Sequence, residues 1–201
     1  MHTPDEKTVL HRYLKTGRDA LLWKLEGLGD YDLRRPMTPT GTNLLGLVKH
    51  VASVSAGYLG DVMGRPFELA PPWLAEEAAP HADLWGPAAE STEFILDLHH
   101  RAAAHADATI EVLDLDAAGQ VPWWGDRGEV TLQQILVHVA TETHRHAGHA
   151  DIIRELIDGA VGMRRDGDNM WADEGEDYWQ RHRQRIEDAA RQSARPAAPD
   201  R

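Results

Sequence analysis

The sequence predicts an all-α protein: a four-helix bundle with one long crossover loop and a C-terminal helical extension. Apolar residues recur at helical spacing in four long segments. No segment shows the sustained alternation of apolar and polar residues that indicates a strand. The chain has 201 residues, 42% of them hydrophobic, which suffices for one sizeable core but is short for two. We therefore expect a bundle over residues 1–162 and an acidic, arginine-rich extension over residues 163–201.

The first two helices are separated by a connection that contains two prolines. The first helix is expected to begin near Thr3, which could cap it, and to end at Gly27. The second carries an apolar stripe over residues 44–58, and either Thr42 or Asn43 could cap it. Both helix starts are therefore predicted from capping residues as well as from apolar periodicity.

Two stretches without periodicity interrupt the middle of the chain. Residues 64–87 are rich in proline and carry two tryptophans, so we expect a long crossover loop there. The third helix is expected from near Pro87 to Leu113. Residues 119–128, which include Pro-Trp-Trp-Gly, form the second irregular stretch.

The fourth helix has the clearest boundaries of all. Thr131 and Gln134 have the spacing of a capping box, and Gly159 supplies a C-terminal stop. The extension that follows is rich in Asp, Glu and Arg, and we expect a short helix over residues 176–192. The proline- and alanine-rich end, residues 195–199, is expected to be disordered.

The net charge of −12 and the absence of cysteine exclude several classes of function. An acidic surface repels nucleic acid and anionic lipid, so we expect neither as a partner. No apolar run reaches the length of a membrane span, and the N-terminal residues lack the apolar core of a signal peptide, so we expect a cytoplasmic protein. Disulfides, cysteine-based zinc sites and a cysteine nucleophile are excluded.

The fourth helix carries an acid and a histidine on its apolar face. Glu142 and His146 lie one turn apart near the middle of that face. Burying a carboxylate and an imidazole there is costly unless something compensates both, and a divalent cation would do so. The spacing of four residues also suits two metal ligands on one helix. The apolar face itself consists of Leu132, Ile135, Val139, Ile153 and Ile157.

A third ligand should come from another helix, because two side chains on one helix cannot complete a metal site. His50, at the flank of the apolar stripe of the second helix, is the best candidate. Two histidines and one carboxylate leave coordination positions open for water or substrate, as in catalytic sites. His138 and His149 lie toward the edge of the face and could support the ligands or line a pocket, whereas His144 lies well off it.

The Glu–His pair and the loop tryptophans each have an alternative interpretation that involves no metal and no pocket. A Glu and a His one turn apart are more commonly a solvated pair or a buried hydrogen bond, and the chain has 12 histidines. Trp123 and Trp124, like Trp73 and Trp85, fall in the irregular stretches, where they could line a pocket for cofactor or substrate. Tryptophans in loops more often anchor the loop to the helices.

The two histidine motifs together resemble the DinB/YfiT-like superfamily of metalloproteins, in particular its uncharacterised mini-circle-type branch. The resemblance covers about residues 5–160. It implies a four-helix bundle that commonly forms a homodimer and binds a divalent metal, zinc first, with nickel, iron or manganese as alternatives. The ligand set His50, Glu142 and His146 is similar to that of the mycothiol-dependent maleylpyruvate isomerases. The motifs are Leu47-Val48-Lys49-His50-Val51 and Glu142-Thr143-His144-Arg145-His146-Ala147-Gly148-His149.

The resemblance also implies a chemistry. Characterised relatives are transferases or isomerases that use a low-molecular-weight thiol such as mycothiol, bacillithiol or glutathione, and a role in detoxification follows from it. The metal would lower the pKa of the thiol, and the thiolate would attack an electrophilic small molecule. A non-enzymatic metal-binding protein of the stress response is the alternative, and a helical bundle without metal is a third.

Overall fold

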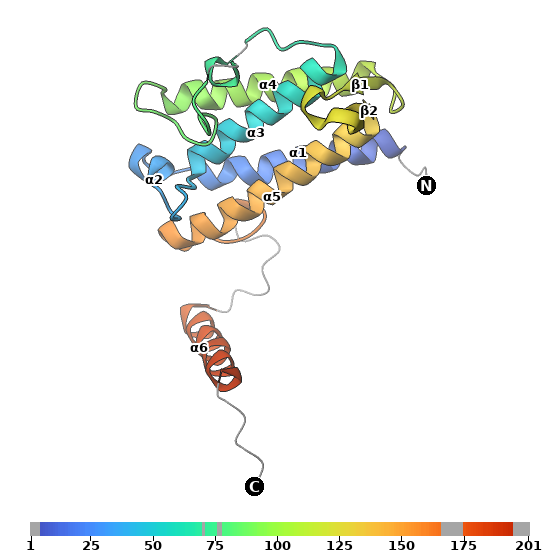
Figure 1. Ribbon diagram of the computed structural model, residues 1–201. Coiled ribbons are helices and arrows are strands. Elements are labelled where there is room, and N and C mark those ends of the chain that lie inside the picture. Colours follow the sequence, from blue (N-terminus) through green and yellow to red (C-terminus); the bar gives the residue numbers. More distant parts are fainter. Residues whose placement is uncertain (1–4, 70, 76–77, 166–174, 195–201) are drawn as a thin grey trace. The chain divides into compact units, whose positions relative to one another are not determined.

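The computed structural model describes residues 5–69, 71–75, 78–165 and 175–194. By its internal contacts the chain divides into two compact units, Met1–Asp168 and Asn169–Arg201. The boundary expected after residue 162 stays a prediction. The larger unit contains four long helices among its described residues: α1 (Glu6–Leu22), α3 (Leu44–Leu59), α4 (Thr92–Val112) and α5 (Leu132–Asp158) (Figure 1).

Shorter elements connect these helices. The 3-10 turns are η1 (Trp23–Leu25), η2 (Asp61–Met63), η3 (Pro72–Leu74) and η4 (Pro122–Arg127), and a short helix, α2, spans Asp30–Arg34. The strands β1 (Ala118–Gln120) and β2 (Glu129–Thr131) pair antiparallel, and the smaller unit contains α6 (Gly175–Ser193). The all-α class predicted from the sequence is confirmed. Within the described residues, no helix has the length and apolar character needed to cross a membrane.

The helix ends follow the capping rules, with two changes from the sequence prediction. Asn43 caps α3, and Thr131 and Gln134 form the predicted capping box of α5. Asp5 caps α1 by accepting a hydrogen bond from the Thr8 amide, whereas Thr3 lies outside the described residues. α4 begins at Thr92 after the cap Ser91, later than expected, because Ser91 offers the first side chain that can bind a free amide of the helix.

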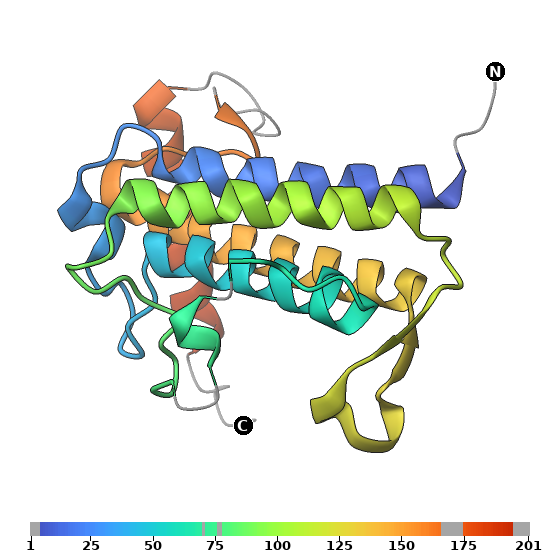
Figure 2. The ribbon, with the colours of Figure 1, turned by 90° about the horizontal axis from the view of Figure 1, so that it is seen from above.

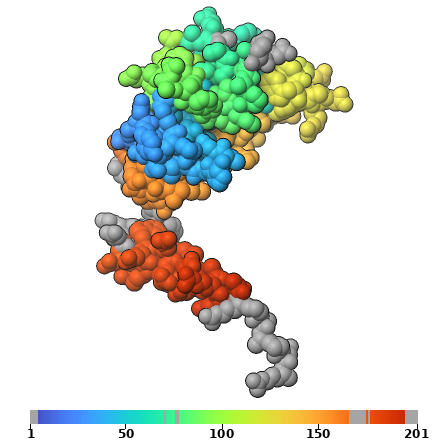
Figure 3. Space-filling model, turned by 60° about the vertical axis from the view of Figure 1, so that its left-hand side comes forward, coloured from blue at the N-terminus to red at the C-terminus, as the bar shows by residue number. Residues whose placement is uncertain are grey.

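The expectation that no strand would form is wrong. Residues 118–120 and 129–131 make a small hairpin, with Gly119 opposite Val130. Each strand has only three residues, so neither is long enough to produce an alternating pattern. The hairpin protrudes at one end of the larger unit and carries η4 at its tip (Figures 2 and 3).

The four long helices run alongside one another (Figures 1 and 2). α3 packs against both α4 and α5, and α1 packs against α5. This central position explains why α3 is apolar over most of its circumference. One core cluster of the unit includes Leu21, Leu45, Val48, Ile95 and Ile153, and the cluster next to the hairpin includes Leu14, Leu59, Ile110, Val130 and Ile135.

α1 and α4 approach each other less closely than the pairs α3–α4, α1–α5 and α3–α5 do, and polar side chains bridge them, so a regular four-helix bundle is not confirmed. Asp107 on α4 accepts hydrogen bonds from His11 at 2.8 Å and from the buried Arg18 at 2.6 Å, and Lys15 lies 3.3 Å from it. His99 of α4 is also buried. This polar layer contrasts with the apolar contacts of α3.

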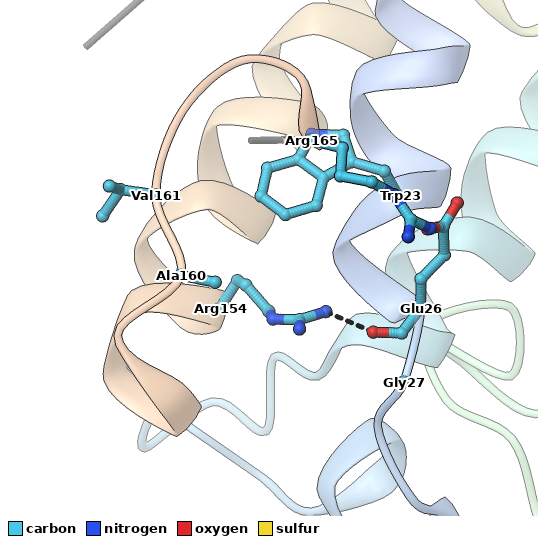
Figure 4. Close-up of a pocket in the computed structure, with 7 residues that line it drawn as sticks. All are labelled: Trp23, Glu26, Gly27, Arg154, Ala160, Val161 and Arg165. Carbon is cyan, nitrogen blue, oxygen red and sulfur yellow. Dashed lines mark hydrogen bonds and ion pairs between the residues drawn. The ribbon is translucent and has the colours of Figure 1, made fainter. Parts of the chain in front are cut away.

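At the other end of α1, Arg154 of α5 joins α5 to η1. Its guanidinium donates to the carbonyl oxygens of Lys24 and Glu26, each at 2.9 Å, and to the Asp158 carboxylate. Figure 4 shows the bond to Glu26. Arg165 pairs with the Glu26 side chain. Glu26, Arg154 and Arg165 line a cavity of about 430 Å³, but both arginines already have partners, so we interpret the cavity as part of the scaffold.

The sequence prediction of a helix over residues 176–192 is confirmed, since α6 spans Gly175–Ser193. The side chains of Trp179 and Ile186 on this helix are exposed in the structure. The expected disorder of residues 195–199 falls outside the described residues.

His99 should make the stability of the protein depend on pH. Burial, followed by the charge of Arg18, lowers the pKa of His99 to about 3, while the unfolded chain keeps a value near 6.5. The unfolded state therefore binds a proton that the folded state does not, and stability falls as pH drops from about 6.5 toward 3, by about 1.4 kcal/mol for each pH unit.

Denaturant unfolding at a series of pH values tests this prediction. Between pH 6 and pH 4, the free energy of unfolding of His99→Leu should fall less steeply with decreasing pH, by the contribution of one bound proton. His100→Leu, at the exposed neighbouring position, should keep the steepness of the wild type. An unchanged slope in His99→Leu would show that other groups cause the acid destabilisation.

Candidate metal centre

Two helices bring the predicted ligands together. His50 comes from α3, and Glu142 and His146 come from successive turns of α5, against which α3 packs. Each side chain is partly buried and offers one ligand atom, and the three atoms all lie within 4.8 Å of one another. Among the described residues, no other group of three or more His, Cys, Asp or Glu side chains has this arrangement.

The two imidazoles and the carboxylate are in close contact. The ring centroids of His50 and His146 are 4.8 Å apart, with the rings nearly perpendicular. Nε2 of His146 lies 3.9 Å from a carboxylate oxygen of Glu142. Burial, followed by the nearby His50, lowers the pKa of His146 to about 4, although Glu142 acts in the opposite direction. His146 is therefore neutral at pH 7, which is the form that binds metal.

The donor atoms fit a divalent ion. Zinc lies about 2.0–2.2 Å from nitrogen and oxygen ligands, which puts the ligand atoms of a tetrahedral site roughly 3.4 Å apart. The observed limit of 4.8 Å exceeds this by an amount that side-chain rotation can close. Two imidazoles and one carboxylate suit zinc, iron, nickel and manganese, and three protein ligands leave at least one position open.

His50 has a partner that the sequence analysis did not find. Its Nδ1 lies 2.6 Å from a carboxylate oxygen of Asp83, in the crossover between α3 and α4. Nδ1 is thereby occupied, and Nε2 remains as the ligand nitrogen. Asp83 lies in a stretch without periodicity, so neither spacing nor a helix face could have singled it out.

The other histidines of α5 occupy three different environments. Nδ1 of His149 lies 3.3 Å from Nδ1 of His146, so His149 contacts a predicted ligand directly. His138 packs against the rings of Tyr58 and Trp124. His144 faces α1, where its Nε2 lies 2.9 Å from the carbonyl oxygen of Tyr13. Of these, His149 is the one in contact with the candidate site.

The two hairpin tryptophans belong to an aromatic cluster rather than to a described pocket. Trp123 donates a hydrogen bond from its indole nitrogen to the Tyr58 hydroxyl at 3.2 Å, and the Trp124 ring lies 5.8 Å from that of Tyr58. Trp123 is nevertheless 61% exposed. The cluster holds the hairpin to α3 and to His138, as expected of loop tryptophans that act as anchors.

A cavity of about 470 Å³ adjoins the candidate site. His146 and His149 form one side of it, the turn before α3 and Leu47 of α3 form another, and the crossover forms the rest. Trp85, from the crossover, is half exposed beside it. The lining residues are Thr40, Gly41, Thr42, Asn43, Leu47, His81, Leu84, Trp85, His146 and His149.

Comparison with known protein families identifies the family of this chain. A family model described as mycothiol-S-transferase matches residues 9–159 of the 201. A search of curated proteins finds no match. The matched region contains all three candidate ligands and Asp83, and it agrees with the resemblance found in the sequence. The chain therefore belongs to the mycothiol S-transferase family, a DinB-like family.

Proposed function

We propose that the protein is a divalent-metal-dependent transferase or isomerase that uses a low-molecular-weight thiol, mycothiol in the first instance, on an electrophilic small molecule. The proposal depends on one observation: the ligand atoms of His50, Glu142 and His146 lie within 4.8 Å of one another, beside a cavity. Family membership supports the choice of thiol.

His50, Glu142 and His146 would hold the metal, and zinc is the first choice for this donor set. When bound, the metal lowers the pKa of a thiol so that the thiolate forms near neutral pH. The chain has no cysteine, so the reacting sulfur comes from the small thiol. The thiolate sulfur forms a bond to the electrophilic carbon, and the leaving group departs with its electron pair.

The protein's own residues would orient the thiol and accept its proton. His149 lies at the cavity next to His146 and offers a ring nitrogen as the proton acceptor. Thr40 and Thr42 supply polar groups to the same cavity, which suits a thiol with a hydroxyl-rich body. The Trp85 ring offers an apolar surface against which that body would pack.

Metal content is the first test. Protein purified without a histidine tag should contain one divalent ion per chain, and Glu142→Ala and His50→Ala should each lose it. His144→Ala is the matched control: it lies on the same helix but faces α1, so metal content should be unchanged. Elemental analysis with a chelator competition measures both. Equal losses in Glu142→Ala and His144→Ala would contradict the ligand assignment.

Thiol transfer is the second test. Metal-loaded protein should consume mycothiol in the presence of a chlorinated aromatic compound, and chelation should abolish the reaction. Trp85→Ala should raise the KM for the thiol roughly threefold to tenfold, in line with the loss of one aromatic contact, and leave the KM for the electrophile unchanged. Tyr31→Ala, an exposed aromatic outside the cavity, is the control.

Metal binding without transfer, across several thiols and electrophiles, would favour a non-enzymatic metal-binding protein over the transferase.

A further inference from the structure

Residues 81–86 of the crossover are held against α3 at several successive points. The side-chain amide of Asn43, the N-terminal cap of α3, donates to the carbonyl oxygen of Leu84 at 3.3 Å. At Gly46, one turn later, an added Cβ would lie only 1.9 Å from the same oxygen, so only glycine permits this approach of loop to helix. Lys49 and His50, on the next turn, make the remaining contacts.

Lys49 is the most buried of these contacts. Its side chain is 1% exposed, and its ammonium donates to the carbonyl oxygens of Ala82 at 2.8 Å and Trp85 at 3.0 Å. It also pairs with Glu90 at 2.7 Å and lies 3.7 Å from the centre of the Trp73 ring. A buried ammonium is stable only with such a full set of partners, so the crossover cannot leave α3 without a large cost.

The two carbonyls that Lys49 binds lie on either side of Asp83 in the chain. The loop backbone is thus fixed at the residue before Asp83 and two residues after it. This places the Asp83 carboxylate 2.6 Å from Nδ1 of His50, the residue that follows Lys49 on α3. Two consecutive residues of α3 therefore act together: Lys49 fixes the loop, and His50 binds the Asp83 carboxylate that the loop carries.

We infer that Asp83 is the positioning residue of His50, and that Lys49 fixes Asp83 for this purpose. The inference depends on the proposed metal site. A carboxylate that accepts a hydrogen bond from Nδ1–H fixes the ring orientation and the tautomer of a histidine, leaves Nε2 free to coordinate, and makes it a stronger donor. The same loop supplies His81, Leu84 and Trp85 to the cavity wall, so one segment positions both ligand and pocket.

Zinc affinity, measured by chelator competition, tests the role of Asp83. Asp83→Ala should weaken zinc binding roughly 10- to 100-fold, the usual cost of losing such a partner. Asp83→Asn should fall between this variant and the wild type, because the amide oxygen still accepts the bond from Nδ1–H but carries no charge. With Co²⁺ in place of zinc, the visible absorption spectrum should change in Asp83→Ala.

Asp107→Asn is the matched control. Asp107 also pairs with a histidine, His11, at 2.8 Å, but between α1 and α4. This variant should lower the free energy of unfolding and leave the zinc affinity and the Co²⁺ spectrum unchanged, so a general loss of stability would be recognised. Wild-type zinc affinity in both Asp83 variants would overturn the inference.

A second readout needs no metal. In metal-free protein, ¹⁵N NMR of the histidine rings should show His50 protonated at Nδ1 in the wild type and in Asp107→Asn, and a mixture of tautomers in Asp83→Ala. If the wild type bound no metal, the proposed function would fall, while this tautomer measurement would still decide whether Asp83 orients His50. A mixture in the wild type would overturn the inference on its own.

The role of Lys49 is tested in the double variant Lys49→Met/Glu90→Gln. Methionine keeps the length and apolar character of the buried stem, and glutamine avoids leaving an unpaired carboxylate. Zinc affinity should fall by less than in Asp83→Ala, because Asp83 is still present but its loop is no longer fixed. An unchanged affinity would remove Lys49 from the proposal.

Discussion

The structure depends on how the polar groups between α3 and α5 are compensated. Two imidazoles and a carboxylate lie there beside apolar side chains, and such groups are costly to bury without partners. His50 has Asp83 and His146 has His149, each through a single ring nitrogen. The nitrogen that remains on each ring, together with the Glu142 carboxylate, gives three atoms that can each offer a lone pair to a cation. A cation is the natural complement of such a set.

The crossover loop completes this arrangement from outside the helices. A loop of this length would ordinarily be variable in position, since few of its backbone groups are satisfied by regular structure. Here Asn43, Gly46 and Lys49 fix it on α3, and Arg34 of α2 binds the carbonyl oxygens of Gly86 and Glu90 where it rejoins α4. These contacts hold the backbone around Asp83 in place, and the Asp83 carboxylate is thereby positioned beside the His50 ring.

The sequence could predict those parts of the fold and site that show in apolar periodicity, in capping residues or in the spacing of residues along one helix. Apolar periodicity and capping residues were enough for the long helices, and the spacing of Glu142 and His146 on one helix face was enough to place them together. Asp83 could not be predicted, because its partner lies 33 residues away and its own stretch has no period. The three-residue strands were missed since they are stabilised by pairing with each other, which no local pattern records.

A comparison of two carboxylates supports the proposal that Glu142 binds a metal. Asp107, between α1 and α4, accepts hydrogen bonds from His11 and Arg18 and pairs with Lys15. The chain itself thus supplies the positive charge and the hydrogen bonds that this carboxylate needs. Among the described residues, Glu142 has only His146, 3.9 Å away, and the depressed pKa of that imidazole, caused first by burial, keeps it neutral. The same chain thus gives one partly buried acid three cationic or hydrogen-bonding partners and leaves the other beside a neutral imidazole. A divalent cation would supply the charge that is missing at the second acid and would be redundant at the first.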